Sequence, residues 1–539
     1  MQGPILANLH AATVIADLAP DESFVRYADR VGQEYSDGAS LKNKKQFAQY
    51  FTPPPVADFM ASLCDLAVRD IRILDAGAGA GILTCAICDR LRKLAKPHTR
   101  LTAELYEADP ALADRLKSVL AAVQSRLAAE QIELIFRVHT EDFILRNAGK
   151  LAECSGLFHA DASTQFDIAM SNPPYFKLSK SDPRARAANV VVHGQPNIYA
   201  LFMAVSAAML KPGGQLIFIT PRSFTSGRYF QAFREWFFSR VQPELVHIFD
   251  SRKKAFQRDA ILQENIILKA LRLENWQRAA SEKRLRISVS HGASDLGCAR
   301  SHEVPISSAL KPGVAGASLL LPASAGESPV LRRRLRKDWS LRKLGLAIST
   351  GPVVAFRAKQ IIADVPGNGG AFAPLLWMQN VKPMRISWPL KGSAKPQYIR
   401  VDHESAKLLL PDRTYVLLRR FSAKEEARRL VAAPLCAGSL KCEYVGIENH
   451  LNYFHRAGAS LREDEAWGLA ALLNGASFDR YFRALSGHTQ VNAAEINEMP
   501  FPGLDEIREI GRRIRNLNDP VGDGELVIAA VLSEPIGVV

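Results

Sequence analysis

The sequence predicts an α/β fold, in which a Rossmann-like, doubly wound sheet of seven mostly parallel strands is followed by a mixed α+β domain. Strand-like and helix-like segments alternate from about residue 71 to residue 271, and such alternation builds a parallel sheet with helices on both faces. A glycine-rich stretch, residues 75–81, directly follows the first strand. The loop between the last two strands is too short for a full crossover helix, which predicts an antiparallel final strand.

The composition is that of a soluble protein with two or three domains. A chain of 539 residues is too long for a single hydrophobic core. No apolar run approaches the roughly twenty residues that a membrane span requires, and the N-terminus lacks the pattern of a signal peptide, so we expect a cytoplasmic location. Seven scattered cysteines argue against a disulfide framework. Cys85 and Cys88 lie within a helical pattern, where small core residues are more common than metal ligands, and we expect no metal site.

The charge of the chain favours a polyanionic partner. Lys and Arg number 69 against 55 Asp and Glu, a formal net charge of +14. Each phosphate that a basic surface neutralises releases counterions, which favours nucleic acid over a membrane. Charge alone is also compatible with a basic cytosolic protein that has no such partner.

Residues 1–45 are predicted to form a helical preamble, and two informative segments follow them. Thr52 is placed to cap a helix whose first turn holds prolines, although a capped core helix would have the same pattern. The first strand then runs into Asp75-Ala76-Gly77-Ala78-Gly79-Ala80-Gly81. Alternate glycines let the backbone approach a ligand closely. The spacing is neither G-x-G-x-x-G nor that of a phosphate-binding loop, so it suits a small nucleoside ligand better than a pyrophosphate.

The second and third strands each lead to acidic residues. The second strand, residues 101–106, is followed by Glu107, whose carboxylate can accept hydrogen bonds from ribose hydroxyls. Residues 132–138 lead to Asp142 and Phe143, which could accept from an adenine amino group and stack on its ring. A helix cap beside a core aromatic is an equally good interpretation of this pair.

The fourth strand, residues 166–170, ends in Ser171-Asn172-Pro173-Pro174-Tyr175. Two prolines fix φ and keep the preceding residues out of the helical region. A rigid turn at a strand end can aim side chains and carbonyls at a substrate. Residues 197–210 and 229–240 are then predicted helices, and residues 215–220, 244–249 and 264–271 complete the seven strands.

Taken in order, these segments resemble the motifs of gamma-class, S-adenosylmethionine-dependent, adenine-specific DNA methyltransferases with a TaqI-like catalytic domain. The resemblance covers about residues 49–271 and implies a class I methyltransferase fold. It implies that S-adenosyl-L-methionine is bound by Thr52, Asp75, Ala76, Gly77, Gly79, Glu107, Ala108, Asp142 and Phe143. The catalytic loop would consist of Asn172, Pro173, Pro174 and Tyr175. Tyr175 and Phe256 would contact a target base that is rotated out of duplex DNA.

The rest of the chain divides into a predicted catalytic domain, residues 46–275, a linker, residues 276–330, a target-recognition domain, residues 331–500, and a C-terminal helix and tail, residues 501–539. Residues 417–425, 447–453 and 486–492 are similar to the BsuBI/PstI branch of restriction–modification methyltransferases. The expected DNA contacts are Arg332, Arg333, Arg334, Arg419 and Arg420, of which the first three belong to a basic cluster expected to follow phosphates. No nuclease motif is visible, so we expect any cognate restriction endonuclease to be a separate chain.

Three other functions remain open at this point. RNA-base and protein-glutamine methyltransferases share the Asn-Pro-Pro-Tyr turn, although they usually lack the Thr-Pro-Pro segment and a large basic domain. A non-catalytic DNA-binding specificity protein could retain a decayed methyltransferase fold. A nicotinamide dehydrogenase is disfavoured by the glycine spacing.

Overall fold

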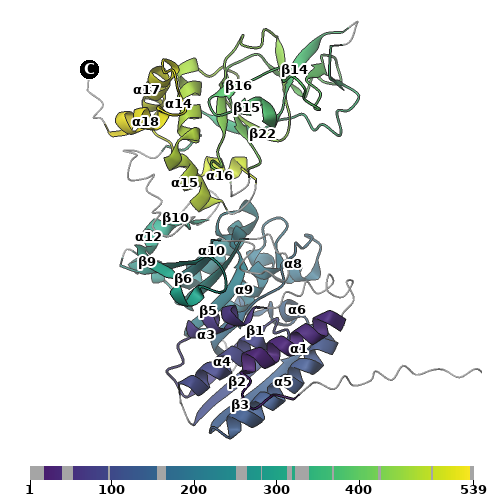
Figure 1. Cartoon of the computed structure of the whole chain (residues 1–539), viewed down its shortest axis with the longest axis vertical. Coiled ribbons are helices and arrows are strands. Elements are labelled where there is room, and N and C mark those ends of the chain that lie inside the picture. The colour runs from purple at the N-terminus through teal and green to yellow at the C-terminus, as the bar shows by residue number, and fades with distance from the viewer. Residues whose placement is uncertain are drawn as a thin grey trace, which may run out of the picture. The chain divides into compact units, whose positions relative to one another are not determined.

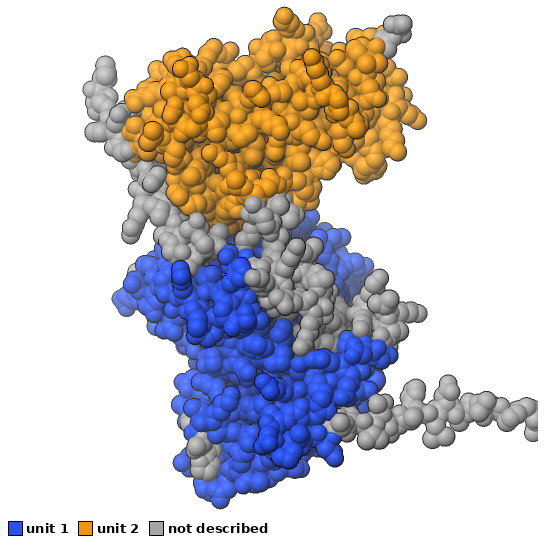
Figure 2. All heavy atoms as spheres, viewed as in Figure 1, with its two compact units in different colours: residues 1–224, 229–310 blue, residues 225–228, 311–539 orange. Residues whose placement is uncertain are grey.

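The computed structural model describes residues 17–38, 52–94, 98–153, 165–250, 264–280, 282–311, 318–321, 339–366, 370–422, 426–486 and 490–533. The chain divides into two compact units (Figures 1 and 2). The first consists of Met1–Phe224 and Tyr229–Leu310, and the second of Thr225–Arg228 and Lys311–Val539. Within the described residues, no helix is long and apolar enough to cross a membrane.

The first unit is built on a nine-stranded sheet with the order β3-β2-β1-β4-β5-β7-β6-β8-β9. The strands from β3 to β5 pair in parallel, and β7 is antiparallel to both β5 and β6. The strand bounds are β1 Asp70–Ala76, β2 Thr99–Tyr106, β3 Ile132–His139, β4 Phe166–Ser171, β5 Leu210–Pro221, β6 Val241–Phe249, β7 Asn265–Arg272, β8 Arg284–Ser290 and β9 Arg300–Pro305.

The predicted α/β class and the antiparallel β7 are confirmed, but the predicted count of seven strands is wrong. β8 pairs in parallel with β6, and β9 pairs antiparallel with β8. Residues 284–305 therefore continue the sheet instead of belonging to a linker. Leu285 and Ile287 are buried at alternate positions of β8, but the polar and small residues around them obscure this strand pattern in the sequence. Without β8, the edge of β6 would expose unpaired backbone groups.

Helices cover the sheet of the first unit and shape its core (Figure 1). α1 packs against α4 and α5, and α3 packs against α4, so that residues 24–38 of the predicted preamble join the core. Every residue of α9 is buried, as expected for a helix that is apolar on all its faces except at Ser206. The helix bounds are α1 Phe24–Gly38, α3 Pro54–Ser62, α4 Ile82–Lys93, α5 Pro110–Ala128, α6 Phe143–Asn147, α7 Lys150–Glu153, α8 Pro183–Ala187, α9 Ile198–Met209 and α10 Gln231–Arg240.

The second unit mixes small sheets with helices, as predicted. A four-stranded sheet has the order β12-β22-β19-β20, and a five-stranded sheet has the order β13-β17-β14-β21-β18. Their bounds are β12 Ala347–Thr350, β13 Ile362–Ala363, β14 Phe372–Leu376, β17 Tyr398–Arg400, β18 Leu409–Pro411, β19 Tyr415–Arg419, β20 Ala432–Leu435, β21 Tyr444–Ile447 and β22 Leu451–His455. The helices are α14 Glu463–Asn474, α15 Ala476–Leu485, α16 Ala493–Asn497, α17 Leu504–Arg515 and α18 Gly524–Ser533.

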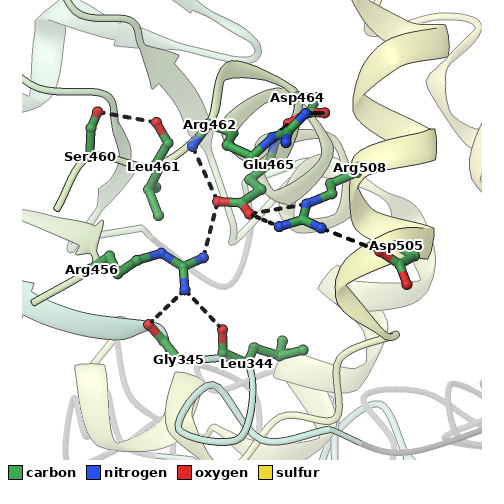
Figure 3. A network of polar contacts seen from close by, with 10 residues as sticks. All are labelled: Leu344, Gly345, Arg456, Ser460, Leu461, Arg462, Asp464, Glu465, Asp505 and Arg508. Atoms are coloured by element: carbon green, nitrogen blue, oxygen red, sulfur yellow. Dashed lines mark hydrogen bonds and ion pairs between the residues drawn. The ribbon is translucent and has the colours of Figure 1, made fainter.

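A buried carboxylate joins the helices of the second unit to its four-stranded sheet (Figure 3). Glu465 on α14 accepts from Arg508 on α17 at 2.8 Å and from Arg456 at 3.1 Å. Arg456 in turn donates to the carbonyl of Gly345. Although burial alone would raise it, hydrogen bonds from Arg508, the Arg462 N–H and Arg456 hold the pKa of Glu465 below its usual value. The network therefore fixes α14 and α17 as one block.

Candidate active site

The candidate site lies where the strand order reverses, at the carboxyl ends of β1 and β4. In open α/β sheets, ligands bind at such a switch point. The hydroxyl of Ser171, at the end of β4, donates to the carbonyl of Ala76, at the end of β1. A Cβ built on Gly77 would lie 3.9 Å from both the Asn172 carbonyl oxygen and Pro174 Cδ. The glycine-rich loop and the Asn-Pro-Pro-Tyr loop are therefore in contact.

The glycine-rich loop requires glycine at alternate positions. The φ angles of Gly77, Gly79 and Gly81 are 78°, 58° and 86°, a region that other residues rarely adopt. A Cβ on Gly81 would also come within 2.6 Å of Leu116 on α5. The loop can thus present bare backbone between β1 and the first turn of α4.

Glu107 ties this loop to the end of β2. Its Oε2 accepts from the Gly79 N–H at 3.0 Å, and its Oε1 accepts from the Asp109 N–H at 2.9 Å. Burial raises the pKa of Glu107 to about 7, against the lowering effect of the two N–H donors. Each carboxylate oxygen retains a lone pair for a further donor. Ala108, the next residue, is exposed.

Asp75 presents a buried acceptor to which no described residue donates. Its side chain is 2% exposed, and Oδ2 accepts from the Thr84 hydroxyl at 2.8 Å. Oδ1 is buried and has no hydrogen-bond partner within the part of the chain that the structure describes. Burial raises the pKa of Asp75 to about 7. Because an unsatisfied buried acceptor is costly, this oxygen is suited to a donor on a bound ligand.

Asp142 and Phe143 have the geometry of a helix cap beside a core aromatic. Asp142 accepts from the Leu145 N–H at 2.9 Å and caps α6. The Phe143 ring is buried, 5.0 Å from the ring centroids of both Tyr106 and Phe202. A role for the pair in binding an adenine ring stays a prediction.

The amide of Asn172 is held from both sides. Nδ2 donates to the Thr52 hydroxyl at 3.1 Å, and Oδ1 accepts from the Tyr175 hydroxyl at 2.5 Å. The Tyr175 hydroxyl also lies 3.0 Å from the Ile219 carbonyl oxygen on β5. Sequence reasoning assigned Thr52 to the cofactor and the Tyr175 ring to a target base, and it missed both contacts to Asn172. No local pattern could reveal a contact that spans 120 residues.

The Tyr175 ring is 7% exposed and lies edge-on to Tyr199, with 6.1 Å between ring centroids. Its stacking on a target base stays a prediction. Phe256, Arg332, Arg333 and Arg334 lie outside the described residues. Both remaining arginines bind backbone carbonyls, Arg419 that of Val381 at 2.8 Å and Arg420 that of Asn449 at 3.0 Å, while each guanidinium has further donors. Their contacts to DNA also stay predictions. No group of three or more metal-binding side chains occurs among the residues described.

Known proteins match this chain along almost its whole length. Residues 87–256 match the family described as Eco57I restriction-modification methylase. The chain is 33% identical over 487 residues to the type II methyltransferase M.BsuBI of Bacillus subtilis, covering 90% of this chain and 93% of that protein. It is 31% identical over 473 residues to M.PstI of Providencia stuartii, covering 87% and 90%.

Two further similarities are more local. The release factor glutamine methyltransferase of Salmonella typhimurium is 30% identical over 164 residues, which are 29% of this chain and 48% of that protein. A class I S-adenosylmethionine-dependent methyltransferase structure from Listeria monocytogenes superposes with a TM-score of 0.37 at 16% identity, covering 51% of this chain and 74% of that one. Because the end-to-end matches exceed 30% identity, the chain belongs to the family of type II restriction–modification methyltransferases that includes M.BsuBI and M.PstI.

Proposed function

We propose that this protein transfers a methyl group to the exocyclic N-6 amino group of an adenine in duplex DNA, as the modification enzyme of a type II restriction–modification system. The observation that carries the proposal is the amide of Asn172, which Thr52 and Tyr175 hold beside the glycine-rich loop. The family match supports DNA methylation in such a system. The choice of adenine depends on the chemistry of the Asn-Pro-Pro-Tyr loop.

The methyl donor of the family is S-adenosyl-L-methionine, which supplies an electrophilic methyl group on a sulfonium. The residues present fit this cofactor, whose ammonium, ribose and adenine groups are hydrogen-bond donors. Asp75 supplies a carboxylate at the end of β1, and Glu107 and Asp142 supply carboxylates after β2 and β3. Among the described residues, none donates a hydrogen bond to the buried Oδ1 of Asp75. Gly77 and Gly79 leave the backbone between these groups uncovered.

The catalytic loop provides two oxygen acceptors for the target amino group. The lone pair of adenine N-6 is delocalised into the ring, which makes the nitrogen a poor nucleophile. If Asn172 Oδ1 and the Pro173 carbonyl accept its two N–H bonds, the nitrogen becomes pyramidal and its lone pair is localised. The prepositioned oxygens also stabilise the positive charge that develops on nitrogen. One such contact is worth about 3 kcal/mol, or roughly a hundredfold in rate.

The target amino group is inaccessible inside a duplex, so the base must rotate out of the stack. We assign Tyr175 and Phe256 to the rotated base, and the second unit, with Arg332, Arg333, Arg334, Arg419 and Arg420, to DNA recognition. Each base–aromatic contact would contribute about 1–3 kcal/mol. The cognate endonuclease would act as a separate chain and a genetic partner. A protein-glutamine methyltransferase is less well supported, because that relative matches only 29% of this chain.

The test maps modified bases in a host that lacks adenine methylation. We expect the wild-type protein to methylate adenine within one short sequence in host DNA. Asn172→Ala should methylate none while it still binds cofactor in calorimetry, because the amide contributes an acceptor and not the cofactor site. Asn189→Ala, which changes an exposed asparagine of the same unit, should retain methylation.

Labelled cofactor incubated with duplex DNA, RNA and protein separates the alternatives. Label in RNA or protein instead of DNA would refute the proposed substrate. A wild-type protein that binds DNA but no cofactor would instead be a non-catalytic specificity protein.

A further inference from the structure

The second unit holds an exposed histidine that a buried carboxylate orients. Glu448 follows β21, and its side chain is 1% exposed, whereas that of His450 is 49% exposed. Glu448 Oε1 lies 2.7 Å from His450 Nδ1, and Oε2 accepts from the His450 backbone N–H at 2.9 Å. Both carboxylate oxygens of Glu448 therefore bind His450. Glu448 contacts the ring through Nδ1, so Nε2 is the ring nitrogen that can contact another molecule.

The segment that carries this pair is rigidly attached to its neighbours. The Glu448 N–H donates to the Leu376 carbonyl at 3.0 Å, and the Asn449 N–H donates to the Val353 carbonyl at 2.9 Å. A Cβ on Gly351 would lie 2.3 Å from the Glu448 carbonyl oxygen, so only glycine allows this approach. A site on such a support holds its side chains in one geometry.

Described residues of three stretches that are far apart in the sequence, residues 417–422, 447–453 and 490–492, come together around His450. The Phe421 ring lies 4.9 Å from the imidazole, and the Arg420 guanidinium lies 5.9 Å from the Phe421 ring centroid. Arg420 also donates to the Asn449 carbonyl at 3.0 Å and accepts from the Val491 N–H at 2.7 Å through its own carbonyl. We call Arg420, Phe421, Glu448, Asn449 and His450 the His450 cluster.

We propose that His450 contacts a base edge in the DNA target sequence and that Glu448 is its positioning residue. This inference rests on the proposed function in DNA methylation. Positive charge favours a contact to a negatively charged phosphate, and the carboxylate of Glu448 beside His450 weakens that attraction. A base-edge contact instead requires one donor or acceptor at a fixed position, which the Glu448 bond provides.

The chemistry of the ring suits this task. Because Nδ1 donates to Glu448, Nε2 is an acceptor in the neutral imidazole and a donor in the protonated form. Either form matches groups on base edges in the major groove. Arg420, in the same cluster, carries a positive charge that strengthens a hydrogen bond to a neighbouring phosphate.

The test compares DNA binding with two duplexes. One contains the sequence that modified-base mapping identifies for the wild-type protein, and the other has the same length and an unrelated sequence. We expect His450→Ala to weaken binding to the first duplex by roughly tenfold to a hundredfold, the range for one lost base contact. Binding to the unrelated duplex and the dependence of both affinities on salt should change little. His403→Ala, which changes another exposed histidine of the same unit, should bind like wild type.

Two further variants examine the role of Glu448. Glu448→Gln should lose part of the discrimination between the duplexes, because an amide no longer supplies two carboxylate acceptors to His450. His450→Gln should recover part of the affinity that His450→Ala loses. If Glu448→Gln does not fold, the two His450 variants decide alone.

Equal loss on both duplexes, with a weaker salt dependence, would identify a phosphate contact and overturn the proposal. Wild-type discrimination in His450→Ala would overturn it as well. These results differ from a failure of the proposed function, in which the wild-type protein itself would methylate no DNA.

Discussion

The proposed catalytic loop depends on how the amide of Asn172 is held. Thr52 precedes α3 in the sequence, and Asn172 follows β4. Tyr175 contacts both Asn172 and β5, so three parts of the first unit meet at one amide group. A carboxamide oxygen can accept a second hydrogen bond besides that from Tyr175. Its position relative to a substrate amino group is then set by Thr52 and Tyr175 instead of by the rotamer of Asn172 alone. Small errors in such positions are costly for the rate.

We therefore expect Tyr175→Phe to lower kcat by roughly tenfold to a hundredfold, because it removes the donor to Asn172 and leaves a ring of the same size. The KM values for cofactor and DNA should change little. Steady-state methylation with labelled cofactor measures both quantities.

Tyr199→Phe is the matched control for this substitution. It removes another buried tyrosine hydroxyl, which lies 2.7 Å from Ser223 Oγ, without removing a bond to Asn172. We expect nearly wild-type kcat. An equal loss in both variants would show a general effect of the buried hydroxyls and contradict the positioning role of Tyr175.

The packing of α14 against α17 depends on two glycines, each of which faces the other helix. A Cβ on Gly468 would lie 1.9 Å from the Ile507 carbonyl oxygen, and one on Gly511 would lie 1.8 Å from that of Asp464. The helices can approach this closely only because both positions lack a side chain. The Glu465 network then bonds the two helices beside the contact (Figure 3).

Gly468→Ala should destabilise the second unit by about 1–3 kcal/mol, the usual cost of overpacking. Alanine favours a helix interior over glycine by about 1 kcal/mol, so any net loss measures the clash with α17. Urea unfolding followed by tryptophan fluorescence is suitable, because Trp467 neighbours the substitution. Gly524→Ala at the start of α18, where the new Cβ would meet only Ile514 Cδ1 at 3.6 Å, is the control. Equal stability of the two variants would contradict the tight packing.

Elements also show what the sequence could and could not predict. The strands from β1 to β7 were predictable from their apolar residues, and β1 to β4 each lead to a motif with an identifiable chemical role. β8 and β9 were not, since their short segments are polar and gain stability from pairing with β6 and with each other. The role of Gly468 was equally hidden, because an isolated glycine in a helical pattern gives no sign of which helix will pack against it.

The proposed function divides methyl transfer and target recognition between the two compact units of the chain. The first unit contains the glycine-rich loop and Asn172, and the second contains the His450 cluster. The sequence predicted a change of character after residue 275, where strand–helix alternation fades. The structure places the boundary of the first unit at Leu310 instead, because backbone pairing continues the sheet beyond the last clear apolar strand.

Both units bury carboxyl groups that ionise near neutral pH. Burial raises the pKa values of Asp75, Glu107 and Glu495 each to about 7. Such a group stabilises the folded protein fully below its ordinary pKa of about 4, and this contribution is lost as the pH rises through about 7. His247 acts in the opposite direction, because burial lowers its pKa to about 4. Because the ordinary pKa of histidine is about 6.5, His247 no longer changes the stability with pH above that value. At higher pH the buried carboxyl groups determine how the stability changes.

The melting temperature of the cofactor-free protein should therefore fall as the pH rises from about 6.5 to 8, over which the carboxyl groups lose their protons. Asp75→Asn should reduce the size of this fall, because a neutral amide of the same shape has no proton to lose and is less costly to bury. Asp114→Asn, at a largely exposed position of α5, should leave the pH dependence unchanged. Scanning fluorimetry at constant ionic strength measures all three proteins. A melting temperature that rises over this interval in the wild type, or an equal fall in Asp75→Asn, would show that Asp75 is already ionised in the folded protein. Its buried oxygen would then hold a donor before any cofactor binds.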